Sequence, residues 1–216
     1  LVRACDLIGQ SALIRVPSHE KGGIGLALDM GASGVVVPQV NTVEEARAVV
    51  HAAKFPPLGE RSYGGRRPID LHGRGYVESA NTDTLLAVQI ESPDGLAQLE
   101  AIAAVPGVDA VNIGPDDVHL RLGGSMTAPR TVDDARRMLD VLCPVCRKHG
   151  KRALVVAGTP EILALSVEMG ADLIAVGSDV NYLASASRKA SEDARRICEG
   201  KRSPAAEPRA AQNSPY

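Results

Sequence analysis

Short, almost uninterrupted runs of apolar and β-branched residues recur along the chain, and most are followed by a longer stretch with the apolar spacing of an amphipathic helix. Apolar runs without alternation are typical of parallel strands that are covered on both faces. The repeated order of strand and helix therefore predicts an α/β fold with a parallel sheet. The predicted strands are Ala12–Val16, Gly34–Val40, Leu85–Ile90, Ala110–Ile113, Ala153–Val156 and Leu173–Val176.

The helical stretches between these runs end at recognisable stop signals. Gly31, Gly150 and Gly170 each follow a helical pattern, where glycine adopts a left-handed C-cap with the least strain. The predicted helices are Val2–Ile8, Ile24–Met30, Thr42–Ala53, Ser92–Ala104, Thr131–His149 and Pro160–Met169.

Two segments fall outside this pattern. The glycine- and arginine-rich stretch Pro56–Thr84 is predicted to be a long irregular loop, a kind of segment that is usually functional or a lid. The segment Glu199–Tyr216 is rich in Pro, Ala, Arg and Ser and is predicted to be disordered. We therefore expect one domain over residues 1–198 and a tail over 199–216.

The composition excludes several classes of function. A net charge of −2 gives no electrostatic signal for nucleic acid or an anionic membrane. One Phe and no Trp leave little material for base-stacking surfaces. No apolar run approaches the length of a membrane span, and no signal peptide opens the sequence.

The four cysteines include one closely spaced pair, Cys143 and Cys146. This spacing occurs in redox and zinc sites, but no second ligand pair accompanies it and the run lies in a predicted helix. We interpret these cysteines as structural and expect a cytoplasmic protein with reduced thiols.

Carboxylates follow two neighbouring predicted strands. Glu91 ends the strand Leu85–Ile90, and Asp116 and Asp117 follow Ala110–Ile113. Adjacent strands of a parallel barrel deliver their carboxyl ends to one rim, where active sites form. Two carboxylates there suit Mg²⁺ or Mn²⁺. Alternatively, Glu91 is only a helix-start acid and Gly-Pro-Asp-Asp only a turn.

Two further charges lie in places that favour a function. Arg15 falls within an apolar strand, where a buried arginine requires an anion such as a substrate carboxylate, or an internal salt bridge. Asp29 lies in the last turn of a helix, where a negative charge opposes the helix dipole. A solvated surface aspartate is the alternative for Asp29.

Several motifs, in the expected order, resemble the HpcH/HpaI aldolase family over residues 1 to about 184, and the form of one also resembles its macrophomate synthase branch. They are Val-Val-Pro-Gln-Val-Asn-Thr-Val-Glu-Glu-Ala from Val36, Lys-Phe-Pro-Pro-Leu-Gly-Glu-Arg-Ser-Tyr from Lys54, Gln-Ile-Glu from Gln89, and Val-Pro-Gly-Val-Asp from Val105 through Gly-Pro-Asp-Asp at Asp117.

This resemblance implies a (β/α)₈ TIM barrel of the phosphoenolpyruvate/pyruvate-binding type and reversible cleavage of a 4-hydroxy-2-oxo acid to pyruvate and an aldehyde. It implies that Glu91 and Asp117 hold a divalent metal (Mg²⁺, Mn²⁺ or Co²⁺). Gln89, Asp116 and Asp117 would bind substrate, with the backbone amide of Asp116 as one contact. Arg15 would stabilise enolate charge and Asp29 would orient a catalytic histidine. A homo-oligomer is also implied.

The family's catalytic histidine lies in an Asp-x-Glu-His motif after the second strand, and this sequence contains no such motif. The sequence opens on Leu1, in what resembles the next helix, and shows six strands. We therefore expect the first two strands to be absent, in a fragment of a longer product or in a truncated homologue. Among the histidines, His19 is best placed to substitute, and His72 could reach inward from a lid.

Two other functions remain open from the sequence. A citrate-lyase-like or malyl-CoA-lyase-like enzyme belongs to the same superfamily, although no CoA site is recognisable. A non-catalytic module that binds a metal and a 2-oxo acid is the alternative from another class. Four arginines in the long loop hint at an acidic substrate, although solvated side chains explain them equally well: Arg61, Arg66, Arg67 and Arg74.

Overall fold

The computed structural model describes residues 1–127 and 130–199. The chain divides into two compact units, Leu1–Val176 and a second that begins at Gly177. The first unit contains all six strands of the sheet. In the second unit the described structure is one helix, α11 (Asp179–Glu199).

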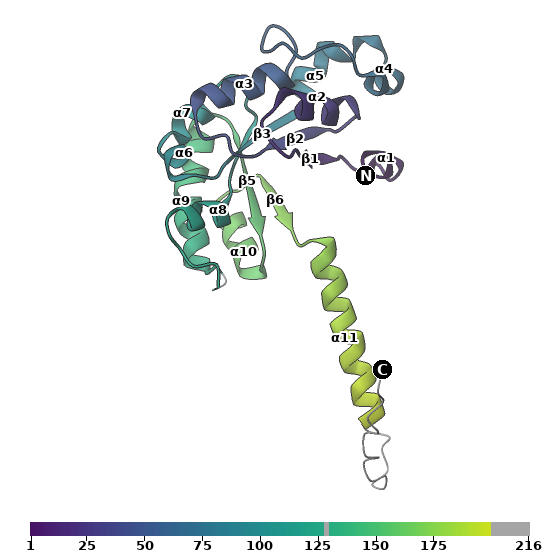
Figure 1. The fold of residues 1–216 in the computed structure, drawn as a ribbon, viewed down its shortest axis with the longest axis vertical. Helices are drawn as coiled ribbons and strands as arrows, with labels where there is room; N and C mark the ends of the chain where they lie inside the picture. The colour runs from purple at the N-terminus through teal and green to yellow at the C-terminus, as the bar shows by residue number, and fades with distance from the viewer. Residues whose placement is uncertain (128–129, 200–216) are drawn as a thin grey trace, which may run out of the picture. The chain divides into compact units, whose positions relative to one another are not determined.

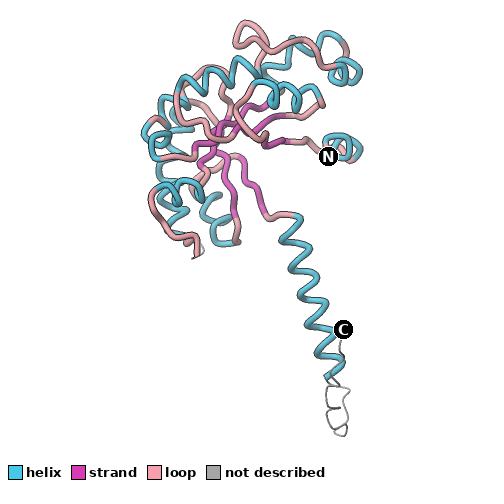
Figure 2. The backbone as a smooth tube through the Cα atoms, in the orientation of Figure 1, coloured by secondary structure: helices cyan, strands magenta, loops and turns pink. Residues whose placement is uncertain are grey.

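All six predicted strands form, and they make one parallel sheet in chain order (Figure 1). Figure 2 shows the strands as the curled inner layer of the first unit, with the helices outside it. The prediction of an α/β fold with a parallel sheet is confirmed. The strands are β1 (Leu13–Arg15), β2 (Gly34–Val37), β3 (Leu85–Ile90), β4 (Ala110–Ile113), β5 (Arg152–Ala157) and β6 (Leu173–Val176).

Strand β2 ends three residues earlier than predicted. Pro38 has no N–H to donate to a neighbouring strand, and Gln39 adopts a left-handed backbone with φ of 56°. The chain leaves the sheet at this point. The consequence for the site is that residues 38–41 form a tight connection at the carboxyl end of β2.

The predicted helices form with small shifts at their ends. The exception is Ser92–Ala104, which is two helices that meet at Gln98, where the backbone is not helical. The Gln98 side chain instead accepts a hydrogen bond from the backbone N–H of Val43. These helices are α1 (Val2–Leu7), α2 (Lys21–Asp29), α3 (Val43–Ala53), α6 (Pro93–Ala97), α7 (Leu99–Ala103), α9 (Val132–Lys148) and α10 (Pro160–Glu168). Helix α8 (Pro115–Arg121) was not among the predicted helices and forms directly after β4.

The prediction of a long irregular loop over 56–84 is wrong. The segment contains α4 (Arg66–His72), the 3₁₀ helix η1 (Arg74–Tyr76) and α5 (Val77–Asp83). Gly73, at φ 79°, separates the first two, so glycine content here marks breaks between short helices. Asn81 fixes the segment to the core, because its side chain exchanges hydrogen bonds of 2.8 and 2.9 Å with the backbone of Phe55.

The two faces of the sheet differ in what they carry. The outer face packs its valines and isoleucines against the helices in the main core. The inner face has a smaller apolar cluster of Val36, Ala87, Ala110 and Leu154. In the next row of the inner face, Gln89 pairs in register with Asn112. Polar side chains therefore begin on the inner face near the carboxyl ends of the strands.

Helix α11 ends at Glu199, the first residue of the predicted disordered tail. Residues 200–216 of that tail lie outside the described residues. This helix was not predicted from the sequence, although its apolar residues follow helical spacing; it is polar on average and none of its residues is buried. Charged pairs one turn apart, such as Lys189 and Asp193 at 3.1 Å, support it locally. Across the described ranges, no helix is long and apolar enough to cross a membrane.

Candidate active site

Gln89 and Glu91 come from the carboxyl end of β3 and lie against the backbone of Gly114, at the end of β4. A Cβ atom on Gly114 would stand 2.7 Å from Glu91 Cγ and 2.9 Å from Gln89 Nε2. Only glycine leaves room for both side chains at this point. The structure thus brings Gln89 and Glu91 together beside the Gly-Pro-Asp-Asp turn.

Glu91 is buried, with 2% of its surface exposed, and it interacts electrostatically with Asp117. Burial raises the pKa of the Glu91 carboxyl, and the like charge of Asp117 raises it further. Arg15 and Arg121, together with a hydrogen bond from Gln39, act in the opposite direction. The two carboxylates therefore lie near enough to interact electrostatically, and burial disfavours the negative charge of Glu91.

The backbone before α3 holds Glu91 in place. The N–H of Gln39 donates to Glu91 Oε2 at 3.0 Å, and the Asn41 side chain accepts from the Glu91 N–H at 3.2 Å. The left-handed conformation of Gln39 is uncommon for a residue that is not glycine, and such strain clusters at functional sites. Sequence reasoning missed both residues, because nothing in the sequence marks Gln39 as strained.

Arg15 is exposed, not buried as its apolar neighbours had suggested. It ends β1, which pairs only with β2 in the described sheet, so its flank is open to solvent. No ion pair engages Arg15 within residues 1–127 and 130–199, but its charge lowers the pKa of Glu91. The internal salt bridge considered for Arg15 is therefore not present there, and the side chain acts on the Glu91 carboxylate from a distance.

Asp116 and Asp117 occupy the first turn of α8, but they differ in surroundings. Asp116 Oδ1 pairs with Arg130 Nε at 2.9 Å. In the part of the chain that the structure describes, the Asp117 carboxylate has no hydrogen bond or ion pair of its own. Asp117 is therefore the member of the pair whose oxygens stay available beside Glu91.

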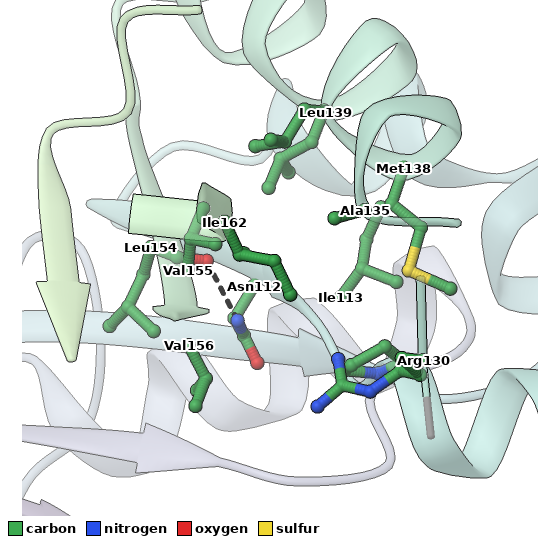
Figure 3. A pocket seen from close by; sticks show the side chains of 12 residues that line it. Asn112, Ile113, Arg130, Ala135, Met138, Leu139, Leu154, Val155, Val156 and Ile162 are labelled. Atoms are coloured by element: carbon green, nitrogen blue, oxygen red, sulfur yellow. Dashed lines mark hydrogen bonds between the residues drawn. The ribbon is translucent and has the colours of Figure 1, made fainter. Parts of the chain in front are cut away.

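Asn112 is a buried polar residue of β4 that sequence reasoning also missed. Its Nδ2 donates to the Leu154 carbonyl at 2.7 Å. Figure 3 shows that Asn112 and Arg130 line one small pocket whose other walls are mostly apolar. A single Asn within a run of apolar strand residues was the available signal, since burial of an amide requires a partner.

Asp29 does not lie with these residues. It ends α2, which precedes β2, so it lies at the amino-terminal end of the sheet, whereas Glu91 follows the carboxyl end of β3. Its Oδ1 accepts from Arg61 Nη2 at 3.0 Å, and a Cβ on Gly65 would come within 2.6 Å of the same oxygen. The orientation of a histidine by Asp29 stays a prediction from the family resemblance, and Arg61 is the partner that the structure gives it.

The loop arginines have partners within the chain, with one exception. Arg61 pairs with Asp29, Arg66 with Asp70 at 2.7 Å, and Arg67 with Asp6. Arg74 is exposed and has no ion pair among the described residues. Three of the four arginines are therefore paired within the chain, and their recognition of an acidic substrate stays a prediction.

None of the histidines of the described segments replaces the missing base by contact with Glu91 or Asp117. His19 and His72 are exposed, and His119 lies 3.2 Å from the carbonyl oxygen of Ser125. Cys143 and Cys146 are buried in α9, as expected for structural cysteines. Burial raises the pKa of the Cys146 thiol to about 12, which makes it a poor nucleophile.

The donor set suits a hard divalent cation. Carboxylate oxygens are the ligands that Mg²⁺ and Mn²⁺ prefer, and such ions keep further positions for water and substrate. Among the described residues no group of three His, Cys, Asp or Glu side chains gathers around one point. Glu91 and Asp117 are the two carboxylates that could hold such a cation here, and its positive charge would offset the repulsion that raises the pKa of Glu91.

Comparison with known proteins identifies the family of this chain. A model of the HpcH/HpaI aldolase/citrate lyase family matches residues 1–186. The chain is 35% identical to 2-dehydro-3,6-dideoxy-6-sulfogluconate aldolase of Pseudomonas putida, over 86% of this chain and 72% of that one. It is 40% identical to 4-hydroxy-2-oxovalerate aldolase of Rhodococcus jostii, over 80% and 67%.

Among solved structures, macrophomate synthase superposes with a TM-score of 0.79 at 25% identity, over 93% of this chain and 71% of that one. The two curated relatives are aldolases, which are carbon–carbon lyases. The chain therefore belongs to the HpcH/HpaI aldolase/citrate lyase family.

Proposed function

We propose that this protein is a divalent-metal-dependent aldolase that cleaves a 4-hydroxy-2-oxo acid to pyruvate and an aldehyde. The observation that carries the proposal is the Glu91–Asp117 carboxylate pair beside Gln89 and Gly114, at the carboxyl ends of β3 and β4. The family membership supports the same chemistry, and the name of one relative, 4-hydroxy-2-oxovalerate aldolase, identifies a 4-hydroxy-2-oxo acid as its substrate.

In this proposal Glu91 and Asp117 hold the cation, which when bound supplies Lewis acidity to the 2-oxo and carboxylate oxygens of the substrate. Gln89 lies beside Glu91 and positions the substrate through its amide. The N–H of Asp116, in the first turn of α8, donates to a substrate oxygen. Because α8 begins at this turn, its amide groups favour a negative charge there.

Arg15 supplies fixed positive charge as the enolate forms. It already lowers the pKa of Glu91, so its field reaches the site. An enolate carries more charge on oxygen than the 2-oxo group does, so this interaction grows in the transition state.

We also propose that the six described strands belong to a (β/α)₈ barrel of the phosphoenolpyruvate/pyruvate-binding type, and that the protein forms a homo-oligomer. Chain-order parallel pairing and helices on the outer face support the barrel. In the described sheet β1 pairs only with β2, and β6 pairs only with β5, so further strands could add at both edges.

Decarboxylation of oxaloacetate tests the enolate half of this mechanism alone. Loss of CO₂ leaves the enolate of pyruvate without removal of a hydroxyl proton, so the reaction does not require the missing base. Pyruvate release should depend on added Mg²⁺ or Mn²⁺ and should stop with EDTA. Asp117→Asn should lower the rate at least about 100-fold, as expected for a misplaced or lost cation. Asp133→Asn, an exposed acid at the start of α9, is the matched control.

Cleavage of 4-hydroxy-2-oxo acids, followed with lactate dehydrogenase, then tests the aldolase itself. Decarboxylation without aldol cleavage would mean that the general base is lacking and that the metal site still supports enolate formation. Metal and pyruvate binding with no turnover in either assay would instead favour a non-catalytic module.

A further inference from the structure

A second polar cavity lies at the opposite end of the sheet from Glu91. It has a volume of about 480 Å³, and residues one or two positions before three strands form its floor: Ser11, Ser33 and Thr84. Side chains of the α4–η1–α5 segment form its other wall: Pro68, His72, Tyr76, Ser79 and Asp83. Arg61 lines it as well, and we refer to it as the Arg61 cavity.

Two residues that line this cavity, Arg61 and Tyr76, and the neighbouring Arg67 each have a buried polar atom with no hydrogen-bond partner within the described residues. These atoms are Arg61 Nε, Arg67 Nε and the hydroxyl oxygen of Tyr76, and these three are the full set of such atoms found in the described ranges. Each belongs to a group that donates a hydrogen bond. A buried donor without a partner is unfavourable, so three in one region indicate that something else receives these bonds.

Arg61 is held rigidly on the wall of the cavity. Only 7% of its surface is exposed, its Nη2 donates to Asp29 at 3.0 Å, and its guanidinium lies 4.8 Å from the centre of the Phe55 ring. The pairing with Asp29 uses one terminal nitrogen and leaves the Nε–H unused. The arginine is therefore placed in advance to donate toward a ligand.

Tyr76 is fixed by the aromatic side chains that the sequence concentrates here. Its ring meets Phe55 edge-on and stacks on Tyr63, each at 5.9 Å between centroids. Burial raises the pKa of the Tyr76 phenol; Arg61 lowers it, Asp29 and Tyr63 raise it, and the net shift is upward, so the hydroxyl keeps its proton and can donate. The chain has only one Phe and no Trp, which makes this clustering notable.

Arg67 adds a third donor at the edge of the cavity. Its Nε lies 3.2 Å from where a Cβ on Gly31 would stand, and Gly31 lines the cavity. Its terminal nitrogen pairs with Asp6, which again leaves the Nε–H free. Both arginines thus pair through their terminal nitrogens and keep the inner N–H for another acceptor.

We propose that the Arg61 cavity binds a small oxyanion, a carboxylate or a phosphate group, through Arg61, Tyr76 and Arg67. Three donors without an acceptor require a ligand rich in lone pairs, which a carboxylate or phosphate is. Asp83 lines the same cavity and would repel a large, highly charged ligand, so the ligand is small. The site lies at the amino-terminal ends of the strands and is separate from the Glu91 site.

Binding of inorganic phosphate and of acetate to the purified chain tests this proposal without any use of activity. Calorimetric titration of each at constant ionic strength, against chloride, distinguishes the two sources of the oxyanion. We expect saturable binding of at least one of them. Tyr76→Phe removes only the hydroxyl and should weaken that binding about 10-fold.

Tyr63→Phe is the matched control, because Tyr63 stacks on Tyr76 but donates its hydroxyl to the Arg74 carbonyl at 3.3 Å. It should bind the oxyanion as the unmodified chain does. Three results overturn the proposal: neither anion binds, Tyr76→Phe binds as tightly as the unmodified chain, or Tyr63→Phe loses binding to the same extent.

Discussion

Substitution of Gly114 by alanine tests whether the positions of Gln89 and Glu91 matter for catalysis. The new Cβ would stand 2.7 Å from Glu91 Cγ, 2.9 Å from Gln89 Nε2 and 3.0 Å from Glu91 Oε1. Ordinary contacts of a Cβ begin at 3.4 Å, so these side chains must move by several tenths of an ångström. The backbone of Gly114, at φ −79° and ψ 95°, accepts alanine without strain, so the effect comes from the side chains.

The expected result is a large loss of rate with a moderate loss of stability. A displacement of about 1 Å at a catalytic group costs roughly 100-fold, so oxaloacetate decarboxylation should fall between about 10- and 100-fold. Overpacking typically costs about 1–3 kcal/mol, which urea denaturation measures. Gly25→Ala, in α2 with nothing within 4 Å of its Cβ, is the control and should keep full activity. Unchanged decarboxylation in Gly114→Ala would refute the assigned roles of Gln89 and Glu91.

Two further predictions concern stability and thiol chemistry. Lys54 is 1% exposed and donates to the Asn81 and Thr84 carbonyls and to Asp109. Lys54→Met should therefore destabilise the fold by about 3 kcal/mol in urea denaturation. The control is Lys148→Met, at an exposed pair with Glu100, which should change stability by less than about 1 kcal/mol; equal effects of the two substitutions would contradict the assigned burial of Lys54. At pH 8 a thiol reagent should modify exposed Cys198 in the folded protein and reach Cys143 and Cys146 only after unfolding. Reaction of all four thiols at one rate would contradict the assigned burial. Because the folded pKa of Cys146, about 12, lies above the ordinary 9.0, its contribution to stability should fall as pH rises from about 9 toward 12, which urea denaturation at several pH values measures.

The sheet was predictable because its signal is local and repeated. Continuous apolar runs such as Leu85–Ile90 can be satisfied only between two covering layers, and this fixed the parallel arrangement. The end of β2 was misplaced because the break depends on Gln39, whose left-handed backbone is stabilised by Glu91, 52 residues later. No local pattern contains that contact.

The segment 56–84 was misread because glycine and arginine suggested a loop. Its helices are short and are held by tertiary contacts. Asn81 bonds to Phe55, Arg67 pairs with Asp6, and the carbonyl of Thr84, just after α5, accepts a hydrogen bond from Lys54. Packing of this kind overrides weak helix propensity, and a single sequence does not show it.

The candidate site was partly predictable. Glu91 and Asp117 follow neighbouring strands, and topology alone brings such residues together. The structure places Arg15 in the open and Asp29 at the other end of the sheet, because burial of β1 and the direction of α2 depend on the three-dimensional arrangement. Asn112, Asn41 and Gln39 were missed because their contacts join strands and turns that lie far apart in the sequence.

The most direct test of the central claim is binding of Mn²⁺ to the chain, measured by electron paramagnetic resonance of the free ion. The proposed site predicts one Mn²⁺ per chain, competed by Mg²⁺, with binding lost in Asp117→Asn and retained in Asp133→Asn. Stoichiometric Mn²⁺ binding that survives Asp117→Asn, or the absence of binding by the unmodified chain, would contradict the assignment of Glu91 and Asp117 as the metal ligands.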